Sequence, residues 1–202
     1  MEGEGSGHDW WHVVRVINNA KTIAKTEGGD IFIIELGALM HDIADHKFHK
    51  GDMTVGPRIT RELLTEIGVA DDIVGKVAYI VENVSFKGGL NIHKMQSIEG
   101  KIVQDADRLD ALGAIGIART FAFGGAMGKE IYNPAKKPSK FTSIDEVQKD
   151  LTQGHTINHF YEKLLLLKDK LNTSTAKKIA ERRHVFMESY LKQFYAEWEG
   201  TR

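Results

Sequence analysis

The sequence predicts an all-α protein of about seven to eight helices with no sheet, and three observations support this class. Apolar residues recur at helical spacing through most of the 202 residues. No stretch of alternating apolar and polar residues bounded by turn residues indicates a strand. Capping residues stand where several helical patterns begin or end. We therefore predict one helical domain over residues 1–202, with a loose N-terminus at residues 1–8.

The first two helices have the clearest start signals. Apolar residues from Val13 to Ala24 keep helical spacing after a candidate N-cap at Asp9. Asp30 is placed to cap a second helix that extends to about Ala44. Apolar residues cover most of the circumference of this second helix, so we expect it to be central and buried.

Five further helical segments follow. Helical spacing predicts a third helix around residues 59–67, ended by Gly68, and a fourth around 73–84. Another helical segment extends from Ser97 to about Phe123, with a break near Asp105. A capping box at Ser143 and Glu146 opens a sixth helix, which apolar spacing over 157–171 continues, and a long last helix covers 179–198.

The longest irregular segment covers residues 124–142 and carries much charge. A loop of this length inside a compact domain is usually functional or disordered. The helices after it are too few to form a core of their own, so it does not indicate a domain boundary. We interpret the segment as a lid over a functional site.

Composition excludes several classes of protein. Lys and Arg number 27 against 28 Asp and Glu, so no basic excess points to nucleic-acid or membrane-surface binding. The chain has no cysteine, which rules out disulfides and thiol catalysis. No apolar run approaches the ~20 residues of a membrane span. Because the start, MEGEGSG, lacks the pattern of a signal peptide, we expect a cytoplasmic protein.

His41 and Asp42 stand side by side at the end of the apolar second helix. An unpaired charge in such a place costs several kcal/mol, so something must compensate it. One explanation is a hydrogen-bonded core histidine beside an ion-paired aspartate. The other is a bound cation.

Two more residues favour the cation. His12 lies at the rim of the apolar face of the first helix, and Asp107 interrupts an apolar helical run. Singly, they are typical of a surface histidine and of an ion pair with Arg108. Together with His41 and Asp42, they offer two imidazoles and two carboxylates, a set that suits Mn²⁺, Fe²⁺, Co²⁺, Ni²⁺ or Mg²⁺. Four protein ligands on an octahedral ion leave room for water and a substrate oxygen, whereas a closed tetrahedral zinc site would be structural.

These four residues and their surroundings resemble the HD-domain superfamily of metal-dependent phosphohydrolases. The similar stretches are HVVRV at His12, LMHDI at His41, DADRLDALGAIG around Asp107 and GHTINHFYEKLLLLKDKLNT from Gly154. The resemblance, to a bacterial branch of the family, spans nearly the whole chain. It implies a helical bundle with a five-helix core around one divalent metal ion, for which we favour Mn²⁺. It also implies hydrolysis of phosphoester or phosphoanhydride bonds, often in nucleotides.

Phosphate hydrolysis needs an activated water and a group that accepts its proton. Asp42 is the residue best placed to touch both metal and water, because carboxylates can bridge. Asp45 follows His41 by four residues and shares its face if the helix persists, so it is our candidate general base. The alternative for Asp45 is a surface ion pair with Lys47 or Lys50.

Substrate phosphates need positive partners, and several candidates are available. They lie one turn after His12, directly after the metal-binding helix, in the long loop and in a later helix; the residues are Arg15, Lys47, Lys129, Tyr132, His155 and His159. Tyr132 is assigned to stacking on a base. The alternatives are a solvated charge run for the lysines and ordinary hydrogen-bonded histidines.

Two departures from the family pattern narrow the activity. Relatives that hydrolyse guanosine tetra- and pentaphosphate have adjacent Glu and Asp after the HD pair, whereas this chain has Ala44 and Asp45. Val84 stands where a two-metal member would have a histidine, which favours one metal unless His46, His49 or His93 contributes.

The most specific hypothesis is hydrolysis of (deoxy)nucleoside triphosphates to monophosphate and pyrophosphate by a metal-activated water. The alternatives are a 5′-nucleotidase that acts on monophosphates and a non-catalytic nucleotide-sensing domain. We expect a monomer or homodimer that binds a small nucleotide, without nucleic-acid or membrane partners.

Overall fold

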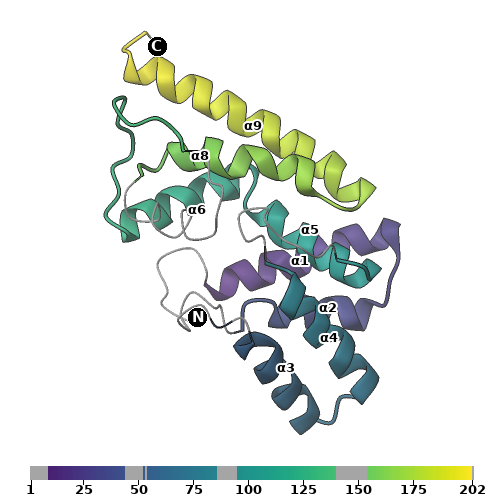
Figure 1. The fold of residues 1–202 in the computed structure, drawn as a ribbon. Helices are drawn as coiled ribbons and strands as arrows, with labels where there is room; N and C mark the ends of the chain where they lie inside the picture. Colours follow the sequence, from purple (N-terminus) through teal and green to yellow (C-terminus); the bar gives the residue numbers. More distant parts are fainter. Residues whose placement is uncertain (1–8, 44–51, 53, 86–94, 140–153, 202) are drawn as a thin grey trace.

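The computed structural model describes residues 9–43, 52, 54–85, 95–139 and 154–201 (Figure 1). Within these ranges the chain forms eight α-helices and one 3-10 helix and contains no strand, which confirms the all-α class. The elements are α1 (Trp10–Glu27), α2 (Ile31–Met40), α3 (Val55–Glu66), α4 (Asp71–Asn83), α5 (Ile98–Asp110), α6 (Gly113–Ala126), α8 (Asn158–Glu162), η3 (Leu164–Lys170) and α9 (Ser174–Trp198).

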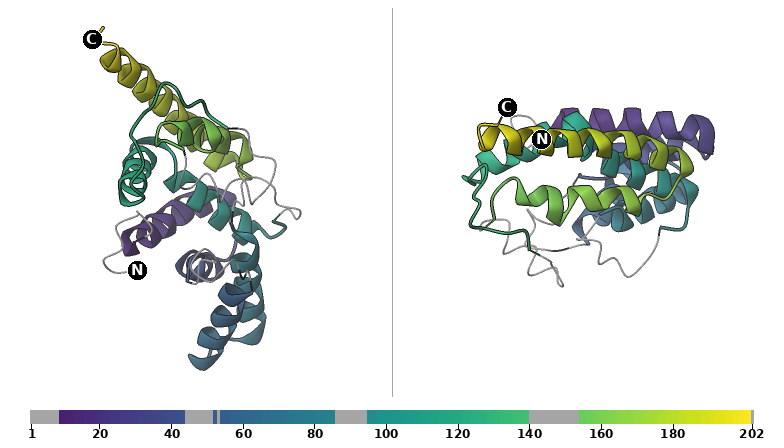
Figure 2. Two further views of the ribbon diagram at one scale, coloured as in Figure 1. Left: turned by 60° about the vertical axis from the view of Figure 1, so that its left-hand side comes forward. Right: turned by 90° about the horizontal axis from the view of Figure 1, so that it is seen from above.

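Helix α5 lies at the centre of the molecule, where it packs against α1 and α2. The α3–α4 hairpin lies at one end, and α9 extends along the opposite end (Figures 1 and 2). Helices α6 and α8 and the 3-10 helix η3 lie on the α9 side (Figure 1). We call α1–α5 the N-terminal bundle and α6–α9 the C-terminal layer.

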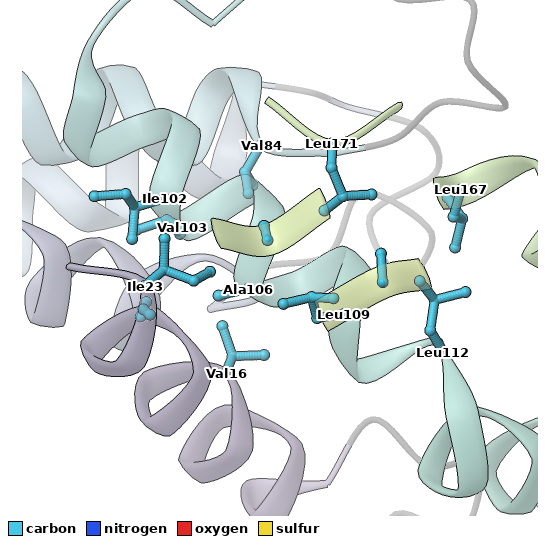
Figure 3. Close-up of a cluster of buried hydrophobic side chains, with 14 of the residues drawn as sticks. Val16, Ile23, Val84, Ile102, Val103, Ala106, Leu109, Leu112, Leu167 and Leu171 are labelled. Carbon is cyan, nitrogen blue, oxygen red and sulfur yellow. The ribbon is translucent and has the colours of Figure 1, made fainter. Parts of the chain in front are cut away.

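One hydrophobic core joins these two parts. Val16 and Ile23 of α1 face Ala106 and Leu109 of α5, and Leu167 of η3 closes the cluster from the C-terminal layer (Figure 3). Burying one such Leu, Ile or Val side chain contributes about 1.5–3 kcal/mol. Since α5 contributes to the core on several sides, its remaining polar residues must be paired within the protein.

Three expected capping residues are confirmed. Asp9 accepts a hydrogen bond from the His12 amide (3.0 Å), and Asp30 accepts one from the Phe32 amide (2.9 Å). Gly68 follows α3 with a φ of 81°, in the left-handed region that favours glycine after a helix.

The second helix is shorter than expected. Helix α2 ends at Met40, not at about Ala44, and residues 41–43 form a turn closed by a hydrogen bond from the Ile43 amide to the Met40 carbonyl (3.0 Å). The condition for placing Asp45 on the same face as His41, a helix that persists to residue 45, is therefore not met. Asp45 itself lies outside the described residues.

The break expected near Asp105 instead lies at residues 111–112, between α5 and α6. Gly113 has a φ of 74°, and a side chain at Gly116 would come within 2.3 Å of the Ala111 carbonyl oxygen. The two glycines thus permit a sharp change of direction. Asp105 stays helical because its carboxylate is hydrogen-bonded to residues 172–173.

The segment 124–142 also differs from the expected continuous loop. Residues 124–126 are the last turn of α6, and residues 140–142 lie outside the described part of the chain, as does the capping box at Ser143. The described part is attached to the start of α8, because the amides of Thr156 and Ile157 donate to the carbonyls of Glu130 and Ile131 (2.9 and 3.1 Å). The role of this segment as a lid stays a prediction.

The apolar pattern over 157–171 forms two short elements instead of one helix. The backbone at Lys163, with φ of −139°, separates α8 from the 3-10 helix η3. None of the helices in the described ranges has both the length and the apolar character that a membrane crossing requires.

Candidate metal centre

His12 lies in the first turn of α1 with its side chain buried. The cap at Asp9 fixes the start of this helix, and α1 packs against both α2 and α5. The imidazole therefore projects toward the ends of two other helices. An unpaired polar group at such depth would be unfavourable, so its partners identify its role.

His41 and Asp42 follow α2 directly, in the turn that ends it. The Nδ1 atom of His41 lies 2.8 Å from the Ala38 carbonyl oxygen. Because a carbonyl oxygen only accepts hydrogen bonds, Nδ1 donates and Nε2 keeps its lone pair. The turn also brings the neighbouring Asp42 carboxylate to the Nε2 side of His41, where the two atoms lie 3.6 Å apart.

Asp107, near the end of α5, completes a group of four side chains that we call the ligand cluster. His12 Nε2 lies 3.2 Å from His41 Nε2 and 3.5 Å from a carboxylate oxygen of each of Asp42 and Asp107. His41 Nε2 lies 3.8 Å from the Asp107 oxygen. Nε2 of each histidine and a carboxylate oxygen of Asp42 all lie within 4.8 Å of one another, as the ligands of one ion must. Asp107 approaches both imidazoles but does not belong to this three-residue group.

This geometry fits a single metal ion. Ligand atoms at the usual 2.0–2.2 Å from one ion lie about 3 to 3.5 Å from each other in tetrahedral or octahedral arrangements. The separations among His12, His41 and Asp42, 3.2 to 3.6 Å, are close to that range. The role of Asp107 as a fourth ligand stays a prediction.

Sequence reasoning missed Asp110, which is buried behind His12. Its Oδ2 atom lies 2.7 Å from His12 Nδ1, so that this imidazole, like His41, has Nδ1 hydrogen-bonded and Nε2 directed into the cluster. A carboxylate in this position orients a metal-binding histidine and raises its basicity. The available signal was the spacing from Asp107, because residues three apart lie on one side of a helix.

The carboxylates also set the charge of the cluster. Burial alone lowers the pKa of His12, but hydrogen bonds with Asp110 and Asp42 and the charge of Asp107 outweigh burial and raise this pKa to about 9. Burial raises the pKa of Asp110, yet its hydrogen bonds with His12 and Arg15 lower it to about 2. The carboxylates around His12 therefore favour positive charge at this position.

Arg15, expected to bind substrate phosphate, forms two hydrogen bonds with Asp110. Its Nε donates to Oδ1 (2.8 Å) and its Nη2 to Oδ2 (3.0 Å). Arg119 of α6 donates to the same carboxylate at 3.0 Å. Arg15 thus lies beside the ligand cluster and contacts it through Asp110.

Tyr132 and His155 lie together in the C-terminal layer. The Tyr132 ring makes edge contacts with His155, Phe194, Tyr195 and Trp198 at centroid distances of 4.9–5.9 Å. His155 is buried, and its two ring nitrogens are hydrogen-bonded to the Lys136 carbonyl (3.1 Å) and the Asn158 amide (3.3 Å). These contacts hold both residues within the C-terminal layer. Their contribution to substrate binding stays a prediction.

The other expected substrate residues are spread along the chain. Lys129 follows α6, where its amide donates to the Gly124 carbonyl (2.8 Å), and His159 is half-buried on α8. Lys47 lies outside the described residues, as do His46, His49 and His93. Their contribution to substrate binding stays a prediction.

The comparison with protein families identifies the N-terminal bundle. A family model described as the HD domain matches residues 10–112, which contain the whole ligand cluster. A curated relative, the uncharacterized protein YpgQ of Bacillus subtilis (strain 168), is 39% identical over 201 residues, which is 99% of this chain and 89% of YpgQ.

Solved structures agree over almost the full length. A protein of Lactobacillus plantarum is 37% identical with a TM-score of 0.83, covering 99% of this chain and 91% of its own. A protein of Bacillus thuringiensis described as an HD-superfamily hydrolase is 44% identical with a TM-score of 0.74, covering 98% and 90%. The structure of YpgQ in complex with ADP is 36% identical with a TM-score of 0.75, covering 97% and 92%.

Proposed function

This chain belongs to the HD domain family, and from that premise we propose that it is a metal-dependent phosphohydrolase that acts on nucleotides. The observation that carries the proposal is the ligand cluster. Its two imidazoles have their Nδ1 atoms hydrogen-bonded, so both Nε2 lone pairs point at the two carboxylates. Four converging donors of this kind are suited to holding a divalent cation.

The ligand cluster has an inner and an outer side. The His12 and His41 side chains are each 1% exposed, whereas Asp42 and Asp107 are 23% and 29% exposed. Water and substrate therefore approach from the carboxylate side. When bound, a divalent cation supplies Lewis acidity, which activates water and draws electron density from a phosphoryl oxygen. Asp42 is at the exposed edge, where it can orient the attacking water. Asp45 remains our candidate for accepting its proton.

We further propose a nucleoside polyphosphate as substrate. The complex of YpgQ with ADP supports this choice, because it is a relative of similar length that binds a nucleoside diphosphate. Attack at the α-phosphorus of a (deoxy)nucleoside triphosphate would release monophosphate and pyrophosphate. Lys47 and Lys129 are candidates for contacting the outer phosphates.

A substrate comparison tests the proposal. Purified protein would be incubated with dATP, dGTP and dAMP in the presence of Mn²⁺, and products would be resolved by chromatography. We expect pyrophosphate from both triphosphates, with a higher kcat/KM than phosphate release from dAMP. Faster release of phosphate from dAMP would favour a 5′-nucleotidase instead. The absence of turnover with all three would favour a nucleotide-binding role.

The matched control for this assay is Asp107→Asn, which keeps the size of the side chain but removes its charge. We expect it to lose most of the turnover and to bind Mn²⁺ more weakly. A contaminating phosphatase would give the same activity in both preparations. Unchanged metal affinity in the variant would remove Asp107 from the set of ligands.

A further inference from the structure

We propose that Arg15, Asp110 and Arg119 form a positioning unit that holds the imidazole of His12 in the orientation needed for metal binding. This inference rests on the metal site of the proposed function and concerns residues that do not themselves bind the metal. It assigns a role to Arg119, which lies outside the residues matched by the HD domain model.

The carboxylate of Asp110 is buried and saturated with hydrogen bonds. Oδ2 accepts from His12 Nδ1 (2.7 Å), Arg15 Nη2 (3.0 Å) and Arg119 Nη1 (3.0 Å), and Oδ1 accepts from Arg15 Nε (2.8 Å). A carboxylate has about four lone-pair directions, so these four donors use its capacity. Two guanidinium groups compensate its buried charge. The carboxylate therefore cannot rotate without breaking charge-assisted hydrogen bonds.

The two arginines reach Asp110 from different helices. Arg15 lies one turn after His12 on α1, so that one helix supplies both the imidazole and a restraint on its partner. Arg119 lies on α6, which returns toward the end of α5 because the chain changes direction at residues 111–112. The three helices that meet at Asp110 thus fix the imidazole plane more firmly than α1 could alone.

Arg183 of α9 supports the change of direction that brings Arg119 back. It donates from Nη1 to the Leu109 carbonyl and from Nη2 to the Asn19 side chain (3.1 Å). Its Cβ lies 3.1 Å from the position that a side chain on Gly113 would occupy. The C-terminal layer therefore holds α6, and through Arg119 it restrains Asp110.

Asp105 shows what a buried carboxylate on α5 does when its role is only structural. It is fully buried, and it also accepts four hydrogen bonds, from the backbone and side chains of Asn172 and Thr173 at 2.7–2.8 Å. None of these donors is an imidazole. Asp105 attaches the start of α9 to α5, whereas Asp110 attaches His12. The two residues are a matched pair for experiment.

The test compares Asp110→Asn with Asp105→Asn. Each substitution keeps the volume, removes the charge and places an amide group among hydrogen-bond donors. Metal affinity would be measured by titration with Co²⁺ in competition with a chromophoric chelator. The visible absorption of the Co²⁺-loaded protein reports the ligand geometry, and denaturant unfolding reports stability.

We expect Asp110→Asn to weaken Co²⁺ binding by about 10–100-fold, the usual effect of losing a group that orients a metal ligand. Its Co²⁺ absorption should differ from that of the wild-type protein. Asp105→Asn should lower stability but leave Co²⁺ affinity within about twofold and the absorption unchanged, since it touches no ligand. Wild-type affinity in Asp110→Asn, or equal weakening in both variants, would overturn the positioning role.

Arg119→Gln is the second variant, and it decides the question if Asp110→Asn does not fold. It leaves Asp110 charged but removes one restraint, so we expect a loss of about tenfold in affinity that Arg119→Lys partly restores. Wild-type affinity in Arg119→Gln would count against the unit. If the wild-type protein itself bound no Co²⁺, the proposed function and this inference would both be wrong. A wild-type protein that binds Co²⁺ while both variants match it would contradict only the inference.

Discussion

Two buried histidines in different regions, His41 in the ligand cluster and His155 in the C-terminal layer, have different kinds of partner. Each has one ring nitrogen hydrogen-bonded to a backbone carbonyl, that of Ala38 for His41 and that of Lys136 for His155. His155 uses its second nitrogen on another backbone group, the Asn158 amide. His41 instead turns its second nitrogen toward a second imidazole and two carboxylates. A buried imidazole with one nitrogen left to face charged groups marks a site, whereas one satisfied twice by backbone contributes to the fold.

The surroundings of the two histidines differ in the same way. Tyr132 and the rings of α9 enclose His155, and edge contacts between aromatic rings are worth about 0.5–1.5 kcal/mol each beyond the area that they bury. The surroundings of His41 concentrate like charges, which costs energy without a cation. The aromatic contacts therefore add stability around His155, whereas the carboxylates around His41 favour a positive partner.

The largest expected effect is a loss of folding stability from a substitution in the aromatic core of the C-terminal layer, with metal binding unchanged. Phe160 is fully buried on α8, between Phe121 of α6 and Tyr190 of α9. Phe160→Ala should lower the free energy of unfolding by about 3–5 kcal/mol, because it leaves a cavity that the neighbours cannot fill. Denaturant unfolding measures this loss. The folded variant should still bind one metal ion. A loss of metal binding in the folded variant would show that the aromatic core and the ligand cluster are coupled more tightly than their contacts indicate.

The second prediction compares the histidines directly. His41→Ala should weaken metal binding by more than about 100-fold, because it removes a ligand and not just a group that orients one. His155→Ala should leave metal affinity unchanged but destabilise the fold by about 1–3 kcal/mol, because two backbone groups lose their partner. Chelator competition and denaturant unfolding on both variants provide the test. A raised KM for nucleotide in a stable His155→Ala protein would restore its sequence-based assignment to substrate binding.

The smallest expected effect lies on the surface of the N-terminal bundle. Arg58 and Glu62 form an ion pair at 3.1 Å on α3 with both side chains about 60% exposed. Arg58→Ala should change the free energy of unfolding by no more than about 0.5 kcal/mol, because solvent screens the pair. Salt titration of both proteins would check this. A larger effect would indicate that the α3–α4 hairpin depends on charge more than on packing.

Local signals predicted much of the fold. Asp9, Asp30 and Gly68 identified helix ends because capping depends on residues only a few positions away. The break between α5 and α6 was placed wrongly, because a buried aspartate in an apolar run resembled an interruption. Only the partners of Asp105, from residues 172–173, explain why the helix continues through it.

Asp110 and Tyr132 mark the limit of prediction for the site. Asp110 stands in the same short stretch as Asp107, and its spacing from Asp107 places both residues on one side of α5. That spacing does not tell a ligand from a residue that orients His12, which lies on α1. Tyr132 was assigned to base stacking from its loop and its chemistry. In the structure its ring contacts rings of α9, more than 60 positions along the chain, and base stacking stays a prediction.

The sequence by itself determined the helical class, the helix caps and the four residues proposed to bind metal, because periodicity, capping and ligand chemistry are properties of residue type and short spacing. Tertiary structure alone decided that His12 and His41 face each other at 3.2 Å, and that Arg15 and Arg119 share Asp110. These contacts join residues up to 95 positions apart. Their distances depend on how α1, α2, α5 and α6 pack, and the packing of a whole core is not encoded in any one local pattern.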